Sequence, residues 1–212
     1  SAMVLRVVAP APVRALELHI RSLVASPERG NHRDPISKEE YGMGIFTSKE
    51  FNSLDELLVA QLEDLYDAEQ RLVEALPKMA EAASTTALKK AFEDHLQETK
   101  GQVNRLEQAF KKLGKDPKRE TCQAMKGLIA EGEEMLQAKG DSNVKDAALI
   151  AAAQRVEHYE IAGYGAARQF AKQTGHQDIA ELLQQTLEEE GNADHKLTEV
   201  AESLVNPEAA VA

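Results

Sequence analysis

Residues 151–167 read AAAQRVEHYEIAGYGAA, a proline-free stretch rich in alanine that favours a helix. Residues three or four positions apart share one face of a helix. Glu157 and Glu160 therefore lie on one face, in line with Ala153 and Tyr164. These glutamates interrupt an otherwise apolar helical line, and this interruption is the basis for the predicted fold and site.

Three other stretches, which correspond to the other long helices predicted below, have apolar lines that acidic residues interrupt in the same way. The polar residues on those lines are Glu69 in the first stretch, His95, Glu98 and Gln102 in the second, and Glu190 and Asp194 in the last. A single glutamate on such a line usually lies at the edge of the core and reaches water, which is the alternative for each position. The run Glu188–Glu190 leaves this choice most open, because two of its three members must face water. Acids are rarely buried unless they are paired. The same interruption in four stretches therefore favours one shared buried cluster over four separate exceptions.

Hydrophobic spacing predicts four long helices and one short helix. The long helices are expected at 53–83, 87–113, 144–174 and 177–205, and the short one at 121–138. Short turns join the first pair and the last pair, whereas about thirty residues, 114–143, lie between the pairs. A long middle connection between two antiparallel pairs is typical of ferritin-like proteins. We therefore predict an all-α fold, a ferritin-like four-helix bundle with a long crossover that carries a short extra helix.

The composition excludes several classes of protein. The 212 residues carry 25 Lys and Arg against 36 Asp and Glu, a net charge of −11, whereas a phosphate backbone attracts clustered bases. We therefore expect no nucleic-acid partner. No apolar run approaches the ~18 residues that span a bilayer, so we expect no membrane partner and a cytoplasmic location. The single cysteine, Cys122, excludes a disulfide framework and a cysteine-rich metal site.

The N-terminal residues differ in charge from the rest of the chain. Residues 1–42 hold six bases and five acids, whereas residues 43–212 hold 19 bases and 31 acids. Ser1-Ala2-Met3 resembles the remnant of a cleaved expression tag. We predict that residues 1–42 are a tag remnant and N-terminal extension, and that residues 43–212 form the helical-bundle domain.

A buried cluster of acids requires positive charge. An unpaired buried carboxylate costs several kcal/mol, and neighbouring carboxylates repel one another. Two divalent cations balance four carboxylates, and oxygen ligands suit Fe²⁺, Mn²⁺ and Mg²⁺. We predict a site for two divalent metal ions, iron foremost, with manganese or magnesium as alternatives. The candidate ligands are Glu69, Glu98, Glu157, Glu160, Glu190, Asp194 and His95, of which His95 either binds a metal directly or orients another ligand.

Nearly all of residues 43–205 resembles the bacterial YciE/YciF family, a ferritin-like group of unknown function that is often linked to stress responses. The resembling segments are LYDAEQRLVEALPKMAEAA (65–83), HLQETKGQVNRLEQAF (95–110), AAAQRVEHYEIAGYGAA (151–167) and LEEEGNADHKLTEVA (187–201). The run EHYEIAGYG is the most specific of these. The resemblance implies a ferritin-like bundle, a dinuclear metal site and a homodimer, and it implies no settled reaction.

The candidate site departs from the pattern of ferritins, rubrerythrins and di-iron oxidases. Those proteins carry Glu-x-x-His on the second and fourth helices, whereas here Gly101 follows Glu98 and Ala193 follows Glu190 at that spacing. A site poor in nitrogen ligands favours hard metals and binds iron less selectively. We expect a stress-related ferritin-like protein that handles iron, oxygen or peroxide. The alternative is a structural or interaction bundle whose metal is vestigial or purely structural.

Overall fold

A computed structural model describes residues 49–212, and this part of the chain is almost entirely helical, with no strand. The bounds are α1 Leu54–Ala82, α2 Thr86–Lys112, α3 Gln123–Gln137, α4 Ser142–Gln173, α5 Gln177–Val200 and α6 Asn206–Ala209, with a π-helical turn at Ala201–Val205. None of the described helices is long and apolar enough to cross a membrane. The predicted extension, residues 1–42, and its boundary at residue 43 lie outside the described residues.

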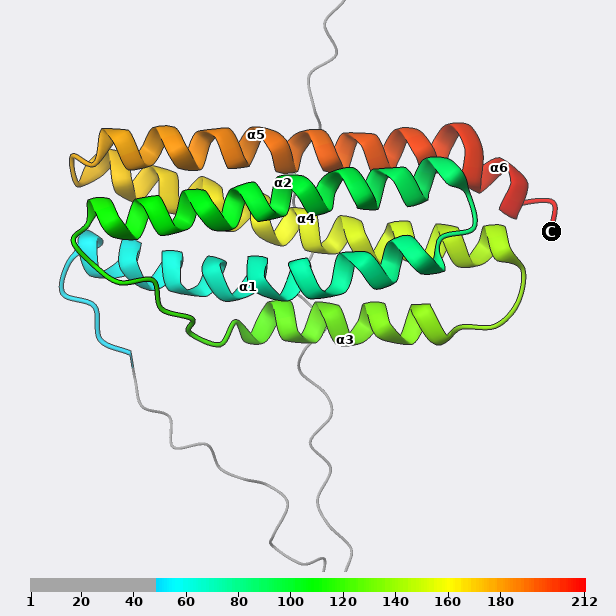
Figure 1. Cartoon of the computed structure of the whole chain (residues 1–212), viewed down its shortest axis with the longest axis horizontal. Coiled ribbons are helices and arrows are strands. Elements are labelled where there is room, and N and C mark those ends of the chain that lie inside the picture. Colours follow the sequence, from blue (N-terminus) through cyan, green and yellow to red (C-terminus); the bar gives the residue numbers. More distant parts are fainter. Residues whose placement is uncertain (1–48) are drawn as a thin grey trace, which may run out of the picture. The chain divides into compact units, whose positions relative to one another are not determined.

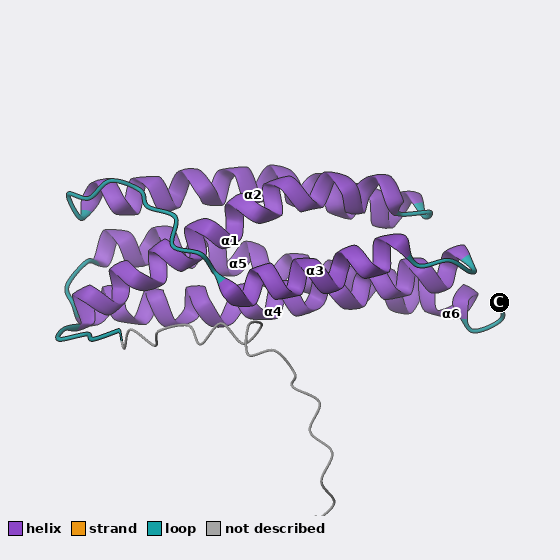
Figure 2. Cartoon of the chain, turned by 90° about the horizontal axis from the view of Figure 1, so that it is seen from below, coloured by secondary structure: helices purple, strands orange, loops and turns teal. Residues whose placement is uncertain are grey.

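The four long helices form a bundle in which neighbouring helices run antiparallel (Figure 1). The neighbouring pairs are α1 with α2, α2 with α5, α5 with α4, and α4 with α1. After α2 the chain crosses the length of the bundle through α3, which packs on α1 and α4 (Figures 1 and 2). This crossover brings the start of α4 to the same end of the bundle as the start of α2. The predicted all-α, ferritin-like bundle with a short helix in its crossover is therefore confirmed.

Local sequence signals set several of the helix ends. The Ser53 and Thr85 side chains accept hydrogen bonds from the backbone N–H groups of Glu56 and Leu88, which caps α1 and α2. Asp141 caps α4 in the same way. The glycines just beyond α2 and α4 adopt positive φ angles, 66° at Gly114 and 83° at Gly175, a conformation that ends helices readily because glycine has no Cβ.

The end of the last long helix differs from the prediction. The spacing predicts a helix to Val205 with Leu204 on its buried face, ended by Pro207. Instead, the π-helical turn buries Val205, leaves Leu204 47% exposed, and is followed by α6. The wider turn rotates the helix face relative to the predicted register. Pro207 lies in the first turn of α6, where its missing N–H is not needed.

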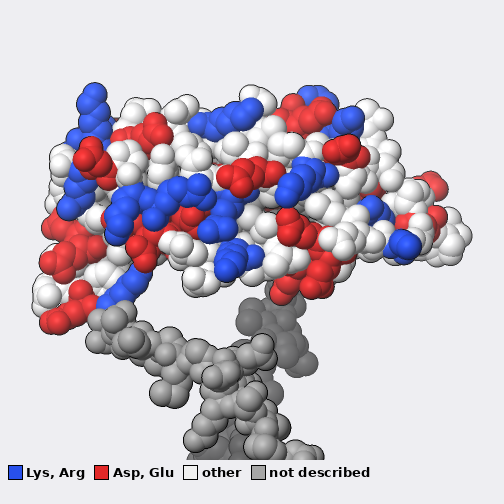
Figure 3. Space-filling view, turned by 60° about the horizontal axis from the view of Figure 1, so that its bottom comes forward, with Lys and Arg blue, Asp and Glu red and all other residues white. Residues whose placement is uncertain are grey.

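Charged side chains of both signs are interspersed on the face of the molecule that Figure 3 shows. Some ion pairs join neighbouring helices. Lys78 Nζ of α1, for example, lies 3.1 Å from Glu133 Oε1 of α3. Such exposed pairs contribute little to stability, so the crossover helix is held chiefly by its apolar contacts with α1 and α4.

The core is divided into two apolar blocks. One block includes Leu72, Phe92 and Leu149, and the other includes Leu62 and Phe110. Along α2, α4 and α5, buried polar residues lie between the two blocks in sequence, and on α1 the buried Glu69 lies between Leu65 of one block and Leu72 of the other. This polar layer consists of Glu69 of α1, His95, Thr99 and Gln102 of α2, Glu157 and Glu160 of α4, and Thr186 and Glu190 of α5. The candidate site is therefore at mid-bundle, between the two apolar blocks.

Candidate metal centre

Four glutamates of the polar layer are buried almost completely. Glu157 and Glu160 lie one turn apart on α4 and are 3% and 0% exposed. Glu69 of α1 and Glu190 of α5 are both 0% exposed. In the run Glu188–Glu190, only Glu190 is buried, which resolves the choice that the sequence left open. Three helices thus bring four predicted carboxylates into the core.

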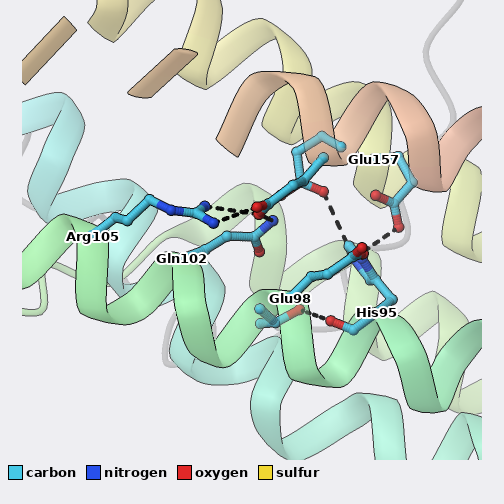
Figure 4. Close-up of polar contacts among 8 residues, drawn as sticks. His95, Glu98, Gln102, Arg105 and Glu157 are labelled. Carbon is cyan, nitrogen blue, oxygen red and sulfur yellow. Dashed lines mark hydrogen bonds and ion pairs between the residues drawn. The ribbon is translucent and has the colours of Figure 1, made fainter. Parts of the chain in front are cut away.

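His95 of α2 completes this group. Its Nε2 lies 3.4 Å from Glu157 Oε1 and 3.7 Å from Glu190 Oε2 (Figure 4). Ligand atoms of His95, Glu157, Glu160 and Glu190 all lie within 4.8 Å of one another, close enough to hold a metal ion. We call these four residues, together with Glu69, the mid-bundle cluster.

Glu69 is linked to the cluster through its charge, and a hydrogen bond from Tyr164 holds its side chain. The Tyr164 hydroxyl donates a hydrogen bond of 2.5 Å to Glu69 Oε1, while Glu69 Oε2 has no partner. Burial raises the pKa of Glu69, and the charge of Glu190 raises it further. Tyr164 therefore bonds a candidate ligand from within the core.

Many polar atoms of the polar layer lack hydrogen-bond partners. They are Glu69 Oε2, His95 Nε2, Gln102 Oε1, Glu157 Oε2, both carboxylate oxygens of Glu160 and both of Glu190. Folded proteins leave very few buried polar atoms unpaired, because each one costs the desolvation energy of the group. A cation could satisfy these atoms, because it accepts lone pairs from oxygen and nitrogen.

The electrostatics of the cluster favour protonation when no cation is present. Burial raises the pKa of Glu160 well above its usual 4.5, and the neighbouring glutamates raise it further. Burial likewise raises the pKa of Glu157 to about 8. Burial lowers the pKa of His95, but its hydrogen bond to Glu98 and the charge of Glu190 outweigh this, so the net pKa lies above 6.5. A bound cation would oppose the shifts of the glutamates.

Two predicted ligands lie outside the cluster. The Glu98 side chain is 44% exposed, and its Oε2 lies 3.3 Å from His95 Nδ1, on the far side of the ring from Nε2. The Asp194 side chain is 25% exposed, and its Oδ1 lies 3.2 Å from His158 Nε2 on the surface. In this structure, therefore, Glu98 contacts the cluster through His95 and Asp194 faces outward.

Sequence reasoning missed a clamp beside the cluster. Arg105 of α2 forms a two-pronged ion pair with Glu189 of α5 and donates a further hydrogen bond of 2.9 Å to Thr186 Oγ1 (Figure 4). Gln102 Nε2 donates to Glu189 Oε2 at 3.2 Å, which leaves Gln102 Oε1 unpaired. The clamp joins α2 to α5 one residue before Glu190. A signal for it existed in the sequence, since Arg105 lies one turn beyond Gln102 on a helical line of candidate ligands.

Two further buried acids lie outside the polar layer, and both have partners. Asp67 is held by Arg71, Arg119 and the backbone N–H of Cys122. Asp146 accepts hydrogen bonds from the backbone N–H groups that precede α2. Neither is a candidate ligand, because its lone pairs are already used.

Comparison with known proteins identifies the family. A family described as "Domain of unknown function (DUF892)" matches residues 53–210. Protein YciF of Escherichia coli K12 is 45% identical over 158 residues, which cover 74% of this chain and 95% of that protein. The crystal structure of the E. coli stress protein YciF superposes with a TM-score of 0.71 at 44% identity, covering 74% of this chain and 99% of that one.

A second solved structure, YcfI of Rhodopseudomonas palustris, matches with a TM-score of 0.70 at 45% identity, again over 74% of this chain and 99% of that one. Both matches therefore cover almost the whole length of the relatives. The segments quoted from residues 65–201 had indicated this relationship, and the comparisons confirm it. The chain belongs to the YciF-like DUF892 family.

Proposed function

We propose that this protein is a ferritin-like stress protein whose mid-bundle cluster holds two divalent metal ions, iron or manganese. The observation that carries the proposal is the convergence of buried, unpaired carboxylate oxygens from α1, α4 and α5. A cluster of this kind destabilises the fold unless a cation or protons neutralise it. The description of the E. coli relative as a stress protein supports the link to stress.

Charge balance supports two ions rather than one. The cluster contains four carboxylates, Glu69, Glu157, Glu160 and Glu190, together with one imidazole that carries no charge when it binds a metal. Two divalent cations neutralise four carboxylates, whereas one leaves two negative charges buried. The donors are mainly oxygen, which suits Fe²⁺ and Mn²⁺.

The residues of the chain have distinct roles in this proposal. The glutamates of α4 and α5 supply oxygen ligands, and His95 Nε2 supplies the nitrogen ligand. The Tyr164 hydroxyl holds Glu69 in one orientation, as outer groups commonly do for metal ligands. The Arg105–Glu189 pair fixes α5 against α2 beside Glu190. A pair of redox-active ions bound there would exchange electrons with O₂ or peroxide.

Metal analysis of protein purified without chelator tests the proposal. We expect about two ions per chain in the wild type, and a loss of at least half in Glu160→Ala, because the variant removes two cluster oxygens. The matched control is Glu188→Ala, which removes an exposed acid two residues from Glu190 on the same helix. Less than one ion per wild-type chain, unchanged by Glu160→Ala, would contradict the proposal.

The alternative is a structural bundle in which the metal only stabilises the fold. The R. palustris relative, which is provisionally assigned as a structural protein, favours this alternative. Oxygen consumption and peroxide turnover of the iron-loaded protein separate the two functions. A purely structural metal raises the melting temperature and yields no turnover. The homodimer implied by the resemblance is a further proposal, and light scattering after size exclusion measures it.

A further inference from the structure

A surface groove between α2 and α5 leads to the mid-bundle cluster. Its volume is about 470 Å³, and its lining includes the buried residues His95 and Glu157. Small side chains on the two facing helices, Ala91 of α2 and Ala193 of α5, form part of its walls. The groove therefore connects the protein surface with two members of the cluster.

The two cluster residues in the groove each have an unpaired atom. His95 is 6% exposed and its Nε2 has no hydrogen-bond partner, and Glu157 is 3% exposed and its Oε2 has none. Buried donors and acceptors left unpaired beside a cavity indicate a site for a polar ligand. These unpaired atoms make the groove more than a surface hollow of the kind that every protein carries.

The charged residues of the groove are compensated, with one exception. Lys90 pairs with Asp94 at 2.7 Å, and Lys196 pairs with Glu199 at 2.9 Å. Glu98 also lines the groove, and its Oε2 lies 3.3 Å from Nδ1 of the His95 ring rather than beside a lysine or arginine. Glu98 therefore offers an accessible carboxylate next to a residue whose other ring nitrogen faces the cluster.

We propose that this groove is the route by which a hydrated divalent cation reaches the mid-bundle cluster, with Glu98 as a transient ligand on the way. This inference rests on the proposed function, because it requires that the cluster binds a cation. A half-exposed carboxylate attracts the cation and replaces some of its water at the mouth. The buried oxygens of Glu157 and then of the other cluster members take its place further in.

The rate of metal uptake tests this route independently of any turnover. The probe is Mn²⁺, mixed with protein stripped of metal by a chelator, and uptake is followed by rapid-freeze EPR as the signal of the free ion disappears. Ala193→Leu and Ala91→Leu each fill the groove. We expect uptake to slow by about tenfold in either variant, with little change in the dissociation constant, because a blocked path changes the association rate before it changes the bound state.

A matched control comes from a second surface hollow, between α1 and α4. It also has a volume of about 470 Å³, and its lining includes Ala162 but no member of the mid-bundle cluster. Ala162→Leu therefore adds the same side chain to a hollow of equal size that lacks a path to the cluster. We expect wild-type uptake in this control. Circular dichroism and thermal melts of all variants establish that each one folds.

Glu98→Gln tests the role of the carboxylate with almost no change in shape. Slower uptake at an unchanged dissociation constant supports a transient ligand. A larger dissociation constant would overturn this role and make Glu98 a resident ligand. An unchanged uptake rate would overturn any role of Glu98 in transit. Wild-type uptake rates in both groove-filling variants would overturn the route itself. Failure of the wild type to bind Mn²⁺, Fe²⁺ or Co²⁺ at all would instead overturn the proposed function, and the route with it.

Discussion

Asp67 and Asp146 are buried as deeply as the glutamates of the mid-bundle cluster, yet they differ from them in having partners. Asp146 accepts two backbone hydrogen bonds of 2.8 Å, from the N–H groups of Ser84 and Thr85. Asp67 joins α1 to the crossover through Arg119 and Cys122. The glutamates of the cluster have no comparable set of donors among the described residues.

This difference separates buried acids that stabilise the fold from buried acids that destabilise it. A partnered buried acid stabilises the structure because its lone pairs accept hydrogen bonds or face positive charge. An unpaired buried acid destabilises it unless something outside the chain supplies the charge. The comparison therefore assigns the buried aspartates to folding and the buried glutamates to a ligand, and each assignment can be tested.

The largest expected effect is the response of the metal-free protein to pH. Burial raises the pKa of Glu157 to about 8 in the folded state, from 4.5, and it raises the pKa of Glu160 in the same direction. Groups with a raised folded pKa stabilise the fold below the unfolded value and lose this contribution as pH rises through the folded value. Between pH 5 and pH 8, we expect the melting temperature of metal-free protein to fall by on the order of 10 °C.

Saturating Mn²⁺ should weaken or reverse that trend. The metal binds the deprotonated carboxylates, so its stabilising effect increases with pH. Thermal melts with chelator and with Mn²⁺, across the same pH range, measure both trends. A metal-free protein that is most stable at pH 8 would contradict the view that the glutamates are unpaired.

The next effect concerns Asp146. Asp146→Ala leaves the N–H groups of Ser84 and Thr85 without acceptors, and each such loss costs about 1–3 kcal/mol. We expect the free energy of unfolding to fall by about 3 kcal/mol. Urea denaturation measures the change. Asp146→Asn is the control. Its amide oxygen can still accept one of the two hydrogen bonds, so we expect about half of the loss in the free energy of unfolding that Asp146→Ala causes.

Substitution of Glu160 should have the opposite sign in metal-free protein. Glu160→Met replaces two unpaired oxygens by an apolar side chain of similar length, and such replacements are neutral or stabilising. We expect a gain of about 1–2 kcal/mol in metal-free protein at pH 8, together with the loss of metal binding. Urea denaturation is again the measurement. A loss of stability as large as that of Asp146→Ala would make Glu160 a folding residue.

The smallest effect is expected at the surface. Lys90 and Asp94 form an exposed ion pair within α2, with side chains 70% and 61% exposed. Lys90→Ala should leave the midpoint of urea denaturation unchanged within error, because water screens such pairs. A midpoint shift as large as that of Asp146→Ala would show that exposed charges contribute to stability as much as the partnered buried acids do.

Much of the fold could be predicted because its signals are local. Caps such as Ser53 and Asp141 and glycines such as Gly114 define helix ends within a few residues of themselves. Helical periodicity placed Glu157 and Glu160 on the core face, and the structure buries both. The π-helical turn at Ala201–Val205 could not be predicted in this way, because a wider turn changes the very spacing on which the prediction depends.

The limit of periodicity is clearest on α2. His95 and Glu98 lie three positions apart on the same helical line, yet His95 is buried and the Glu98 side chain is 44% exposed. An apolar helical face is broad, at least 100° wide, so spacing alone does not decide which of two residues near its edge is covered. Which of the two is covered depends on how the neighbouring helices pack on α2.

The sequence by itself determined the helices, their pairing around a long crossover, and the acids that interrupt each apolar line, because all of these follow from 3.6-residue periodicity and local caps. Only the tertiary structure decided which acids meet. It brought Glu69, Glu157, Glu160 and Glu190 together with His95, left Glu98 at a groove, and joined Arg105 to Glu189. Contacts between helices depend on how their faces are rotated against one another, and no spacing within a single helix contains that rotation.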